Sequence, residues 1–362
     1  MGSEMRIGII TFHSSYNFGS ALQAYAMQTA IEGLGHVATI IDYQSRDWEQ
    51  YGLISLRHPR RSLRVFKNLS GYYGRRAAFD RFSSSFLRLT ENRYSYKDEE
   101  KLEDLQADFD CFVCGSDQIW NLDCTHGIVE PFFLSFAGDK RRVAYAPSLA
   151  HTSFKPENFD EAQVAGLLAA FDFISIREVE TLPLFQPLVD KLIDVVLDPT
   201  LLLNVADYKR IVSAPPVEGG YIFMYLLREC AELVESTVAM AGLTGKKVAY
   251  VSERNLSIPN SVNLFGIGPS EFLSAIAHAD AVMANSFHAA VFSTLFHKPF
   301  RVFATDGSGA RMRDLLGDLG IGERCVDRVE SSPITDVDWD GVERRLAALR
   351  VHSLDYLGKA LS

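Results

Sequence analysis

Apolar and polar positions follow one another along this chain in a rhythm typical of parallel βαβ units. A β-branched run at 6–12 predicts a buried strand, apolar residues at three-to-four spacing predict a helix over 20–34, and residues 37–43 predict a second strand. Such a unit implies a parallel sheet with right-handed crossovers. Further strands are expected at 110–114, 142–146, 171–176 and 194–197.

A second α/β series follows the linker-like stretch 215–220, Pro-Pro-Val-Glu-Gly-Gly. Its expected strands are 221–227, 247–251, 281–284 and 300–304, and its expected helices are 230–241, 270–279 (with Ser270 as N-cap) and 286–296. We therefore predict an α/β protein with two Rossmann-like domains facing a cleft. The predicted parts are an N-terminal domain at 5–205 with a basic insert at about 50–100, a C-terminal domain at 206–335, and a C-terminal helix at 336–362 that packs back on the first domain.

Composition narrows the class of protein. A net charge of −10 over 362 residues argues against a general nucleic-acid binder, because no global cationic field collects phosphates. Five cysteines, an odd number, predict reduced thiols and a cytoplasmic protein. Cys111 and Cys114 fall on one predicted strand and point to opposite faces, so no shared metal or disulfide is expected. No apolar run approaches the ~20 residues of a membrane span.

Segment 57–81 departs from the acidic average. It holds eight basic residues against Asp80, with apolar residues between them. One interpretation is a solvated helical insert with a basic surface. The other is an amphipathic patch that approaches the inner face of an anionic membrane or a pyrophosphate-linked acceptor.

Ligands of open parallel sheets bind beyond the carboxyl ends of the strands, which directs attention to a few loops. The loop after the first strand carries His13 and Asn17 and ends at a helix N-terminus, so it is either a binding loop or only a turn. Residues 114–121, Cys-Gly-Ser-Asp-Gln-Ile-Trp-Asn, follow another strand. There, Asp117 is a candidate general base or a helix cap.

Later loops supply cations. Arg177 ends a strand and is suited to bind carboxylate or phosphate, although neighbouring Glu178 offers a structural ion pair instead. His288 lies in the first turn of a helix that Asn285 or Ser286 is expected to cap, where it can act as acid, base or anion contact. The glycine-rich loop 306–313 delivers Arg311 and Arg313, one of which is expected to reach the cleft.

These segments, in this order, resemble the polysaccharide pyruvyl transferase family over roughly residues 6–320. The segments that carry the resemblance are 8–11, 17–25, 114–121, 144–148, 175–178, 198–202, 285–288 and 298–300. The resemblance implies a fold like that of GT-B glycosyltransferases. It also implies transfer of pyruvate from phosphoenolpyruvate onto two hydroxyls of a saccharide, with no metal or organic cofactor, in cell-surface polysaccharide biosynthesis.

With that chemistry in view, the candidates divide by role. Catalytic candidates are His288 as the acid toward carbon 3 and Asp117 or His13 as the base; donor-binding candidates are Arg177, Ser286, Phe287, His288, Arg311 and Arg313; acceptor-binding candidates are Asn17, Gln118, Trp120 and Asn121. Family members often carry Arg two residues before the His, where this chain has Ser286. Either Arg311 or Arg313 compensates, or the donor differs.

Two alternatives stay open. A GT-B glycosyltransferase that uses a nucleotide sugar would share the fold, but it should supply a carboxylate for the ribose, and the late loops offer Asp306 followed by arginines. A non-catalytic binding member would keep the site without turnover, which the Ser286 departure motivates. The acceptor sugar, its attachment to a lipid and the oligomeric state are also open.

Overall fold

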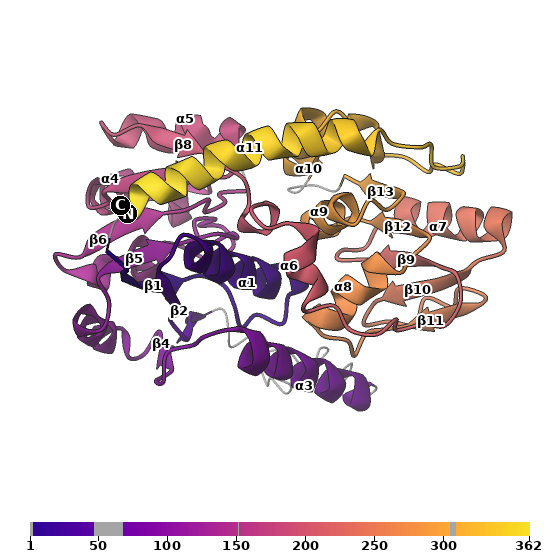
Figure 1. Cartoon of the computed structure of the whole chain (residues 1–362), viewed down its shortest axis with the longest axis horizontal. Coiled ribbons are helices and arrows are strands. Elements are labelled where there is room, and N and C mark those ends of the chain that lie inside the picture. The colour runs from indigo at the N-terminus through magenta and orange to yellow at the C-terminus, as the bar shows by residue number, and fades with distance from the viewer. Residues whose placement is uncertain (1–2, 47–67, 151, 305–308) are drawn as a thin grey trace. The chain divides into compact units, whose positions relative to one another are not determined.

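Two parallel sheets organise the chain, as the computed structural model in Figure 1 shows. The structure describes residues 3–46, 68–150, 152–304 and 309–362. Unit 1 consists of the described residues within Met1–Gly52, Ser83–Leu203 and Leu349–Ser362, and unit 2 of those within Leu53–Phe82 and Asn204–Ala348. The prediction of an α/β protein with two Rossmann-like sheets is confirmed.

Within the described residues, the main sheet of unit 1 has the order β2-β1-β5-β6-β7-β8, all parallel. Its strands are short and largely buried, as expected for a sheet covered on both faces. The elements of unit 1 are β1 (Arg6–Ile10), α1 (Phe18–Gly33), β2 (Val37–Ile40), β3 (Tyr43–Gln44), β4 (Tyr94–Ser95), β5 (Cys111–Cys114), β6 (Arg141–Ala144), α4 (Glu161–Ala169), β7 (Phe173–Ile176), α5 (Leu182–Phe185) and β8 (Ile193–Val195).

Helix α1 begins where the sequence placed a polar turn. The side-chain oxygen of Asn17 accepts hydrogen bonds from the backbone N–H groups of Gly19 (2.9 Å) and Ser20 (3.4 Å), which satisfies donors that the first helical turn leaves unpaired. Most of the helix is buried, and it packs against β2 and the turn Pro199–Leu201. Asn17 therefore fixes where the loop after β1 becomes helix.

The sheet of unit 2 has the order β11-β10-β9-β12-β13-β14 within the described residues, again all parallel. Helix α7 contacts β9, β10, β12 and β13, and it ends at Gly245, which has a φ of +66°. The elements of unit 2 are α3 (Leu69–Phe86, assigned to this unit as far as Phe82), α6 (Val205–Lys209), β9 (Tyr221–Tyr225), α7 (Ala231–Thr244), β10 (Lys247–Val251), β11 (Ser261–Asn263), α8 (Pro269–Ala277), β12 (Ala281–Ala284), α9 (Phe287–Leu295), β13 (Phe300–Phe303), α10 (Gly309–Asp318) and β14 (Cys325–Val326).

The predicted caps of two helices in unit 2 need correction. Helix α8 is capped at Gly268 and not at Ser270, because Pro269 takes the first helical position and the Glu271 carboxylate accepts the Gly268 N–H at 3.1 Å. Ser286 occupies the N-cap position of α9 but makes no side-chain capping bond. The Asn285 amide instead accepts from the backbone N–H of residue 227 and donates to the carbonyl of residue 228, both at 2.8 Å.

The described part of the basic insert packs within unit 2, whereas the sequence prediction left the whole insert in the N-terminal domain. Tyr72 of α3 lies edge-on to Phe265, with ring centroids 4.9 Å apart. The Arg75 guanidinium lies over the Phe265 ring at 5.5 Å, and Arg81 pairs with Glu271 at 2.8 Å. These contacts engage two of the charges proposed for a membrane patch. The basic residues at 57–67 lie outside the described residues.

The C-terminal helix α11 (Trp339–Ala360) belongs to both units, since unit 1 resumes at Leu349. Its second half is bonded to unit 1. The Ser353 hydroxyl oxygen accepts the Leu197 N–H at 3.0 Å, and the Tyr356 hydroxyl donates to the Ala144 carbonyl at 3.0 Å. The end of this helix is therefore tied to β6 and to the segment after β8.

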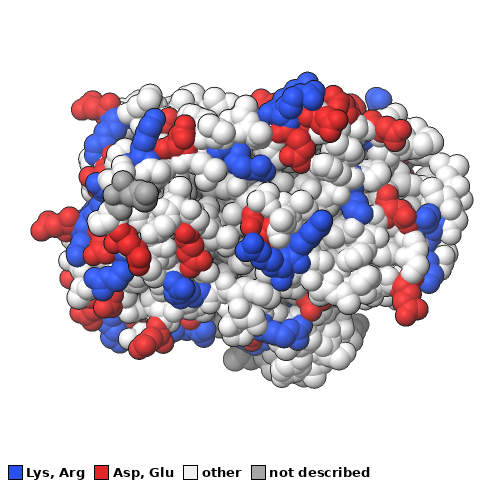
Figure 2. Space-filling model, in the orientation of Figure 1, with Lys and Arg blue, Asp and Glu red and all other residues white. Residues whose placement is uncertain are grey.

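Charges of both signs are mixed on the face shown in Figure 2, where Lys and Arg lie among Asp and Glu. A patch of one sign does not dominate that face. Within the part of the chain that the structure describes, every helix is too short or too polar to span a membrane.

Candidate functional site

A pocket of about 120 Å³ opens in unit 1 where β1, β2 and β5 end. Strand β1 lies between β2 and β5, so the chain leaves β1 toward one side of the sheet and later returns on the other. Ligands of doubly wound sheets bind at such a switch point. The lining residues that matter most are Phe12, His13, Ser20, Tyr43, Asp117 and Gln118.

Asp117 supplies the carboxylate of this pocket, and it is 9% exposed. One carboxylate oxygen accepts the Ser20 hydroxyl, and the other accepts the backbone N–H of Gln118 at 2.8 Å. The backbone of Asp117 has a φ of +62°, a conformation that non-glycine residues seldom adopt. This loop thus holds a carboxylate in a defined position at the pocket wall.

The backbone around Asp117 is held by polar residues from β1 and α1. The Ser116 N–H donates to the Gln23 side-chain oxygen at 3.3 Å, and the Thr11 hydroxyl donates to the Ser116 carbonyl at 3.0 Å. Gly115 has a φ of +109°, and a Cβ there would overlap the Tyr145 carbonyl oxygen. The loop 115–117 therefore needs glycine at its first position.

His13 lies in a buried chain of hydrogen bonds beside the pocket. Its Nδ1 faces the Thr11 carbonyl oxygen at 3.2 Å, and its Nε2 faces an Asp42 carboxylate oxygen at 3.1 Å. Burial alone would raise the pKa of Asp42, but hydrogen bonds and charge from His13 and Arg93 outweigh it and lower that pKa. Both ring nitrogens of His13 therefore lie within hydrogen-bond distance of a protein oxygen.

This arrangement argues against the predicted role of His13 as a base, because both ring nitrogens already face protein oxygens. His13 instead pairs with Asp42 beside the pocket. Of the two residues proposed as the base, Asp117 and His13, Asp117 is therefore the better candidate.

Two of the four predicted acceptor-binding residues line the pocket and two do not. Asn17 and Gln118 line the pocket. Trp120 does not, since it is 0% exposed, is stacked on the Phe133 ring at 5.1 Å and donates its indole N–H into the core. Asn121 is 3% exposed, and its amide donates to the Gln118 side-chain oxygen at 2.8 Å. The prediction for Trp120 is wrong, and Asn121 shapes the loop.

The predicted donor-binding residues belong to both units. In unit 1, the Arg177 side chain is 5% exposed and lies between two carboxylates, 3.0 Å from Glu178 and 2.6 Å from Asp198. The arrangement favours the ion-pair alternative over the prediction that Arg177 faces a cleft. Burial alone would lower the pKa of Arg177, but the two carboxylates outweigh it and raise that pKa.

In unit 2, the candidates cluster around the start of α9 and in α10. Ser286 and Phe287 are buried, and His288 is half-buried with its ring edge-on to Phe287 at 5.3 Å. Arg311 is half-buried and Arg313 is exposed on α10. Residues 305–308, including Asp306, lie outside the described residues. The donor-binding role of this group stays a prediction.

Sequence reasoning missed Asp42, Ser20 and Gln23 as site residues. Asp42 follows the carboxyl end of β2, so the rule that selected the other loops would have found it. Ser20 and Gln23 are one turn apart on α1, and only the return of β5 beside β1 brings the Asp117 loop to them. The described residues contain no group of three or more His, Cys, Asp or Glu placed to hold a metal ion.

The chain is similar to one protein family in sequence and to several solved structures in fold. A family model described as polysaccharide pyruvyl transferase matches residues 17–307, most of the chain. No curated protein matches the sequence. Three solved structures are similar over nearly their whole length at 10–11% identity.

One is a putative UDP-N-acetylglucosamine 2-epimerase from Listeria monocytogenes, 11% identical, with a TM-score of 0.45 and 97% of each chain covered. The UDP-GlcNAc 2-epimerase from Methanocaldococcus jannaschii is 11% identical, with a TM-score of 0.48 and coverage of 95% of this chain and 92% of that chain. UGT89C1 from Arabidopsis thaliana is 10% identical, with a TM-score of 0.48 and coverage of 99% and 95%. At these TM-scores the likenesses carry no argument, and the fold class rests on the two sheets.

Proposed function

Because this chain belongs to the polysaccharide pyruvyl transferase family, we propose that it transfers pyruvate from phosphoenolpyruvate onto two hydroxyls of a saccharide, in cell-surface polysaccharide biosynthesis. The product is a cyclic ketal, and the pocket of unit 1 holds the acceptor saccharide. The single observation that carries the placement of the acceptor is the Asp117 carboxylate, fixed at the wall of a pocket at the switch point of the sheet.

The pocket suits a neutral, hydroxyl-rich ligand better than a phosphate. Its described lining contains serine hydroxyls, the amides of Asn17 and Gln118 and two aromatic rings, Phe12 and Tyr43, but neither Lys nor Arg. Aromatic and apolar walls with a few placed polar groups are typical of small-molecule sites. A sugar ring offers the matching apolar face and hydroxyl edge.

The proposed reaction forms two C–O bonds at carbon 2 of phosphoenolpyruvate and breaks its C–O bond to phosphate. A proton is added to carbon 3, so carbon 2 becomes electrophilic, and the two acceptor hydroxyls lose one proton each. One of these protons balances the proton gained by carbon 3, and the other leaves with phosphate. Asp117 takes the proton of the attacking hydroxyl as general base, and His288 is the candidate acid toward carbon 3.

Phosphate release tests this proposal. Purified protein is incubated with phosphoenolpyruvate and a panel of saccharides, and the product is identified by mass spectrometry as a pyruvyl ketal. Asp117→Asn should reduce turnover by about 100-fold or more, the range of general-base catalysis, whereas Asp98→Asn, at an exposed pair with Lys101, should retain wild-type turnover. Sugar transfer from UDP-sugars without ketal formation would refute the proposed reaction. Binding of phosphoenolpyruvate without turnover over the whole panel would indicate a non-catalytic member.

A further inference from the structure

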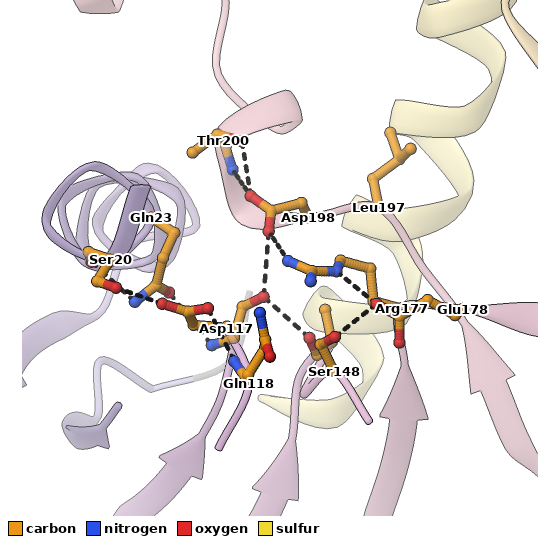
Figure 3. Close-up of polar contacts among 12 residues, drawn as sticks. Ser20, Gln23, Asp117, Gln118, Ser148, Arg177, Glu178, Leu197, Asp198 and Thr200 are labelled. Atoms are coloured by element: carbon orange, nitrogen blue, oxygen red, sulfur yellow. Dashed lines mark hydrogen bonds and ion pairs between the residues drawn. The ribbon is translucent and has the colours of Figure 1, made fainter. Parts of the chain in front are cut away.

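The Arg177 guanidinium lies between the buried carboxylates of Glu178 and Asp198, and the Asp117 carboxylate at the pocket wall is close enough to interact with its charge. Figure 3 shows its guanidinium between Glu178 and Asp198, with Asp117 to the left, beside Ser20. The side chains of Glu178 and Asp198 are 5% and 0% exposed. Burying two carboxylates is costly unless a cation compensates them, and the Arg177 guanidinium supplies that cation.

Each of these carboxylates is also bonded to the loop that carries Asp117. Asp198 accepts the Ser116 hydroxyl at 3.3 Å, and Ser116 directly precedes Asp117. Glu178 accepts the Ser148 hydroxyl at 2.6 Å, and the Ser148 N–H donates to the Asp117 carbonyl at 2.8 Å. The network therefore holds the loop in place at two points, the Ser116 side chain and the Asp117 backbone carbonyl.

The charges also act on one another. Asp117 is, with Glu178 and Asp198, one of the three carboxylates whose charge favours the protonated Arg177 guanidinium. The other titratable or charged side chains around this pocket and network are Tyr145, the His13–Asp42–Arg93 chain, Tyr43 and Cys124. Without Arg177, the buried carboxylates of Glu178 and Asp198 would lose the cation that lies between them.

We propose that Arg177 is a positioning residue that keeps the Asp117 carboxylate correctly aimed and is electrostatically coupled to it, and that it does not bind the donor. This inference rests on the proposed function, in which Asp117 is the base for an acceptor hydroxyl. Arg177 acts through Asp198 and Ser116 on one side of Asp117 and through Glu178 and Ser148 on the other.

The first test needs no substrate. Protein labelled with ¹³C-carboxyl aspartate is titrated by NMR, and the Asp117 signal is identified by its loss in Asp117→Asn. Arg177→Met should move the Asp117 midpoint up, since the attraction of the guanidinium is lost. Asp198→Asn should move it down, because one negative neighbour is gone. Arg177→Lys keeps the charge but cannot bond to both carboxylates as the guanidinium does, so its upward shift should be smaller than that of Arg177→Met.

Arg6→Met is the matched control, because Arg6 pairs with Asp110 at the opposite end of β1 from the pocket. The titration midpoint of Asp117 in Arg6→Met should equal that in the wild type. Should Arg177→Met fail to fold, Asp198→Asn and Arg177→Lys decide alone. Shifts in the same direction in Arg177→Met and Asp198→Asn, or an unmoved Asp117 midpoint in Asp198→Asn, would overturn the positioning role.

Kinetics separate this role from donor binding. In Arg177→Lys, the KM for phosphoenolpyruvate should remain within about threefold of the wild type while kcat falls, and in Asp198→Asn the acid limb of the kcat profile should follow the NMR midpoint. A KM for phosphoenolpyruvate raised tenfold or more in Arg177→Lys, with an unchanged Asp117 titration, would identify Arg177 as a donor ligand. If the wild type forms no ketal while the NMR shifts occur, the proposed function fails and the electrostatic role of Arg177 stands.

Discussion

Replacing Asp42 by Asn removes the charge that holds His13 beside the pocket. Asp42 is 6% exposed and accepts from His13 Nε2 at 3.1 Å and from Arg93 Nε at 2.8 Å. The amide keeps the size of the side chain but removes the negative charge that His13 and Arg93 face. Arg93 is 61% exposed on its side chain, so water replaces most of its lost bond.

The expected cost therefore comes mainly from His13, whose side chain is 2% exposed. Breaking a buried ion pair by removing one partner costs about 3–5 kcal/mol, and loss of the exposed Arg93 contact adds about 0–1 kcal/mol. The expected loss is therefore about 3 kcal/mol at neutral pH. Urea unfolding followed by tryptophan fluorescence measures this difference.

The pH dependence gives a second signature. The pKa of Asp42 is lowered in the folded chain, so its stabilisation is fully present above its unfolded value of about 3.9 and is lost as pH falls through the folded value. The difference between wild type and Asp42→Asn should thus shrink below about pH 4. Asp98→Asn is the control at an exposed pair. A loss under about 1 kcal/mol at neutral pH would refute a stabilising buried pair between Asp42 and His13.

Three further predictions concern other parts of unit 1. Trp120→Ala should lower the free energy of unfolding by about 3–5 kcal/mol in urea titrations, because the indole is fully buried; a small loss of stability with weakened saccharide binding would restore its predicted ligand role. Gly115→Ala should reduce the yield of folded protein, as measured by circular dichroism and size-exclusion chromatography, because its backbone and surroundings exclude a Cβ; wild-type yield would contradict this. Iodoacetamide at about pH 8 should modify the exposed Cys124 well before Cys111 and Cys114, as intact-mass and peptide analysis would show. Burial raises the pKa of Cys111 to about 12 and that of Cys114 well above its ordinary value, and early labelling of either thiol would refute that burial.

The order of strands and helices could be predicted from the sequence because local patterns encode it. Residues 247–251 and 281–284 were expected as strands and are β10 and β12 with the same bounds. Asp117 and Asn17 were found because strand ends and helix starts are visible in the sequence and ligands gather there. The family resemblance was visible for the same reason, since its segments are local.

What the sequence could not determine is which side chains meet. Trp120 follows polar residues and looks like part of a binding loop, but the chain turns it into the core beside Phe133. Arg177 has Glu178 next to it in sequence, whereas its second partner, Asp198, arrives only because β8 pairs with β7. Burial and pairing depend on strand order, and strand order is set by contacts between residues far apart in the chain. The tertiary structure therefore determined that Asp117 lines a pocket and that Arg177 is buried between Glu178 and Asp198.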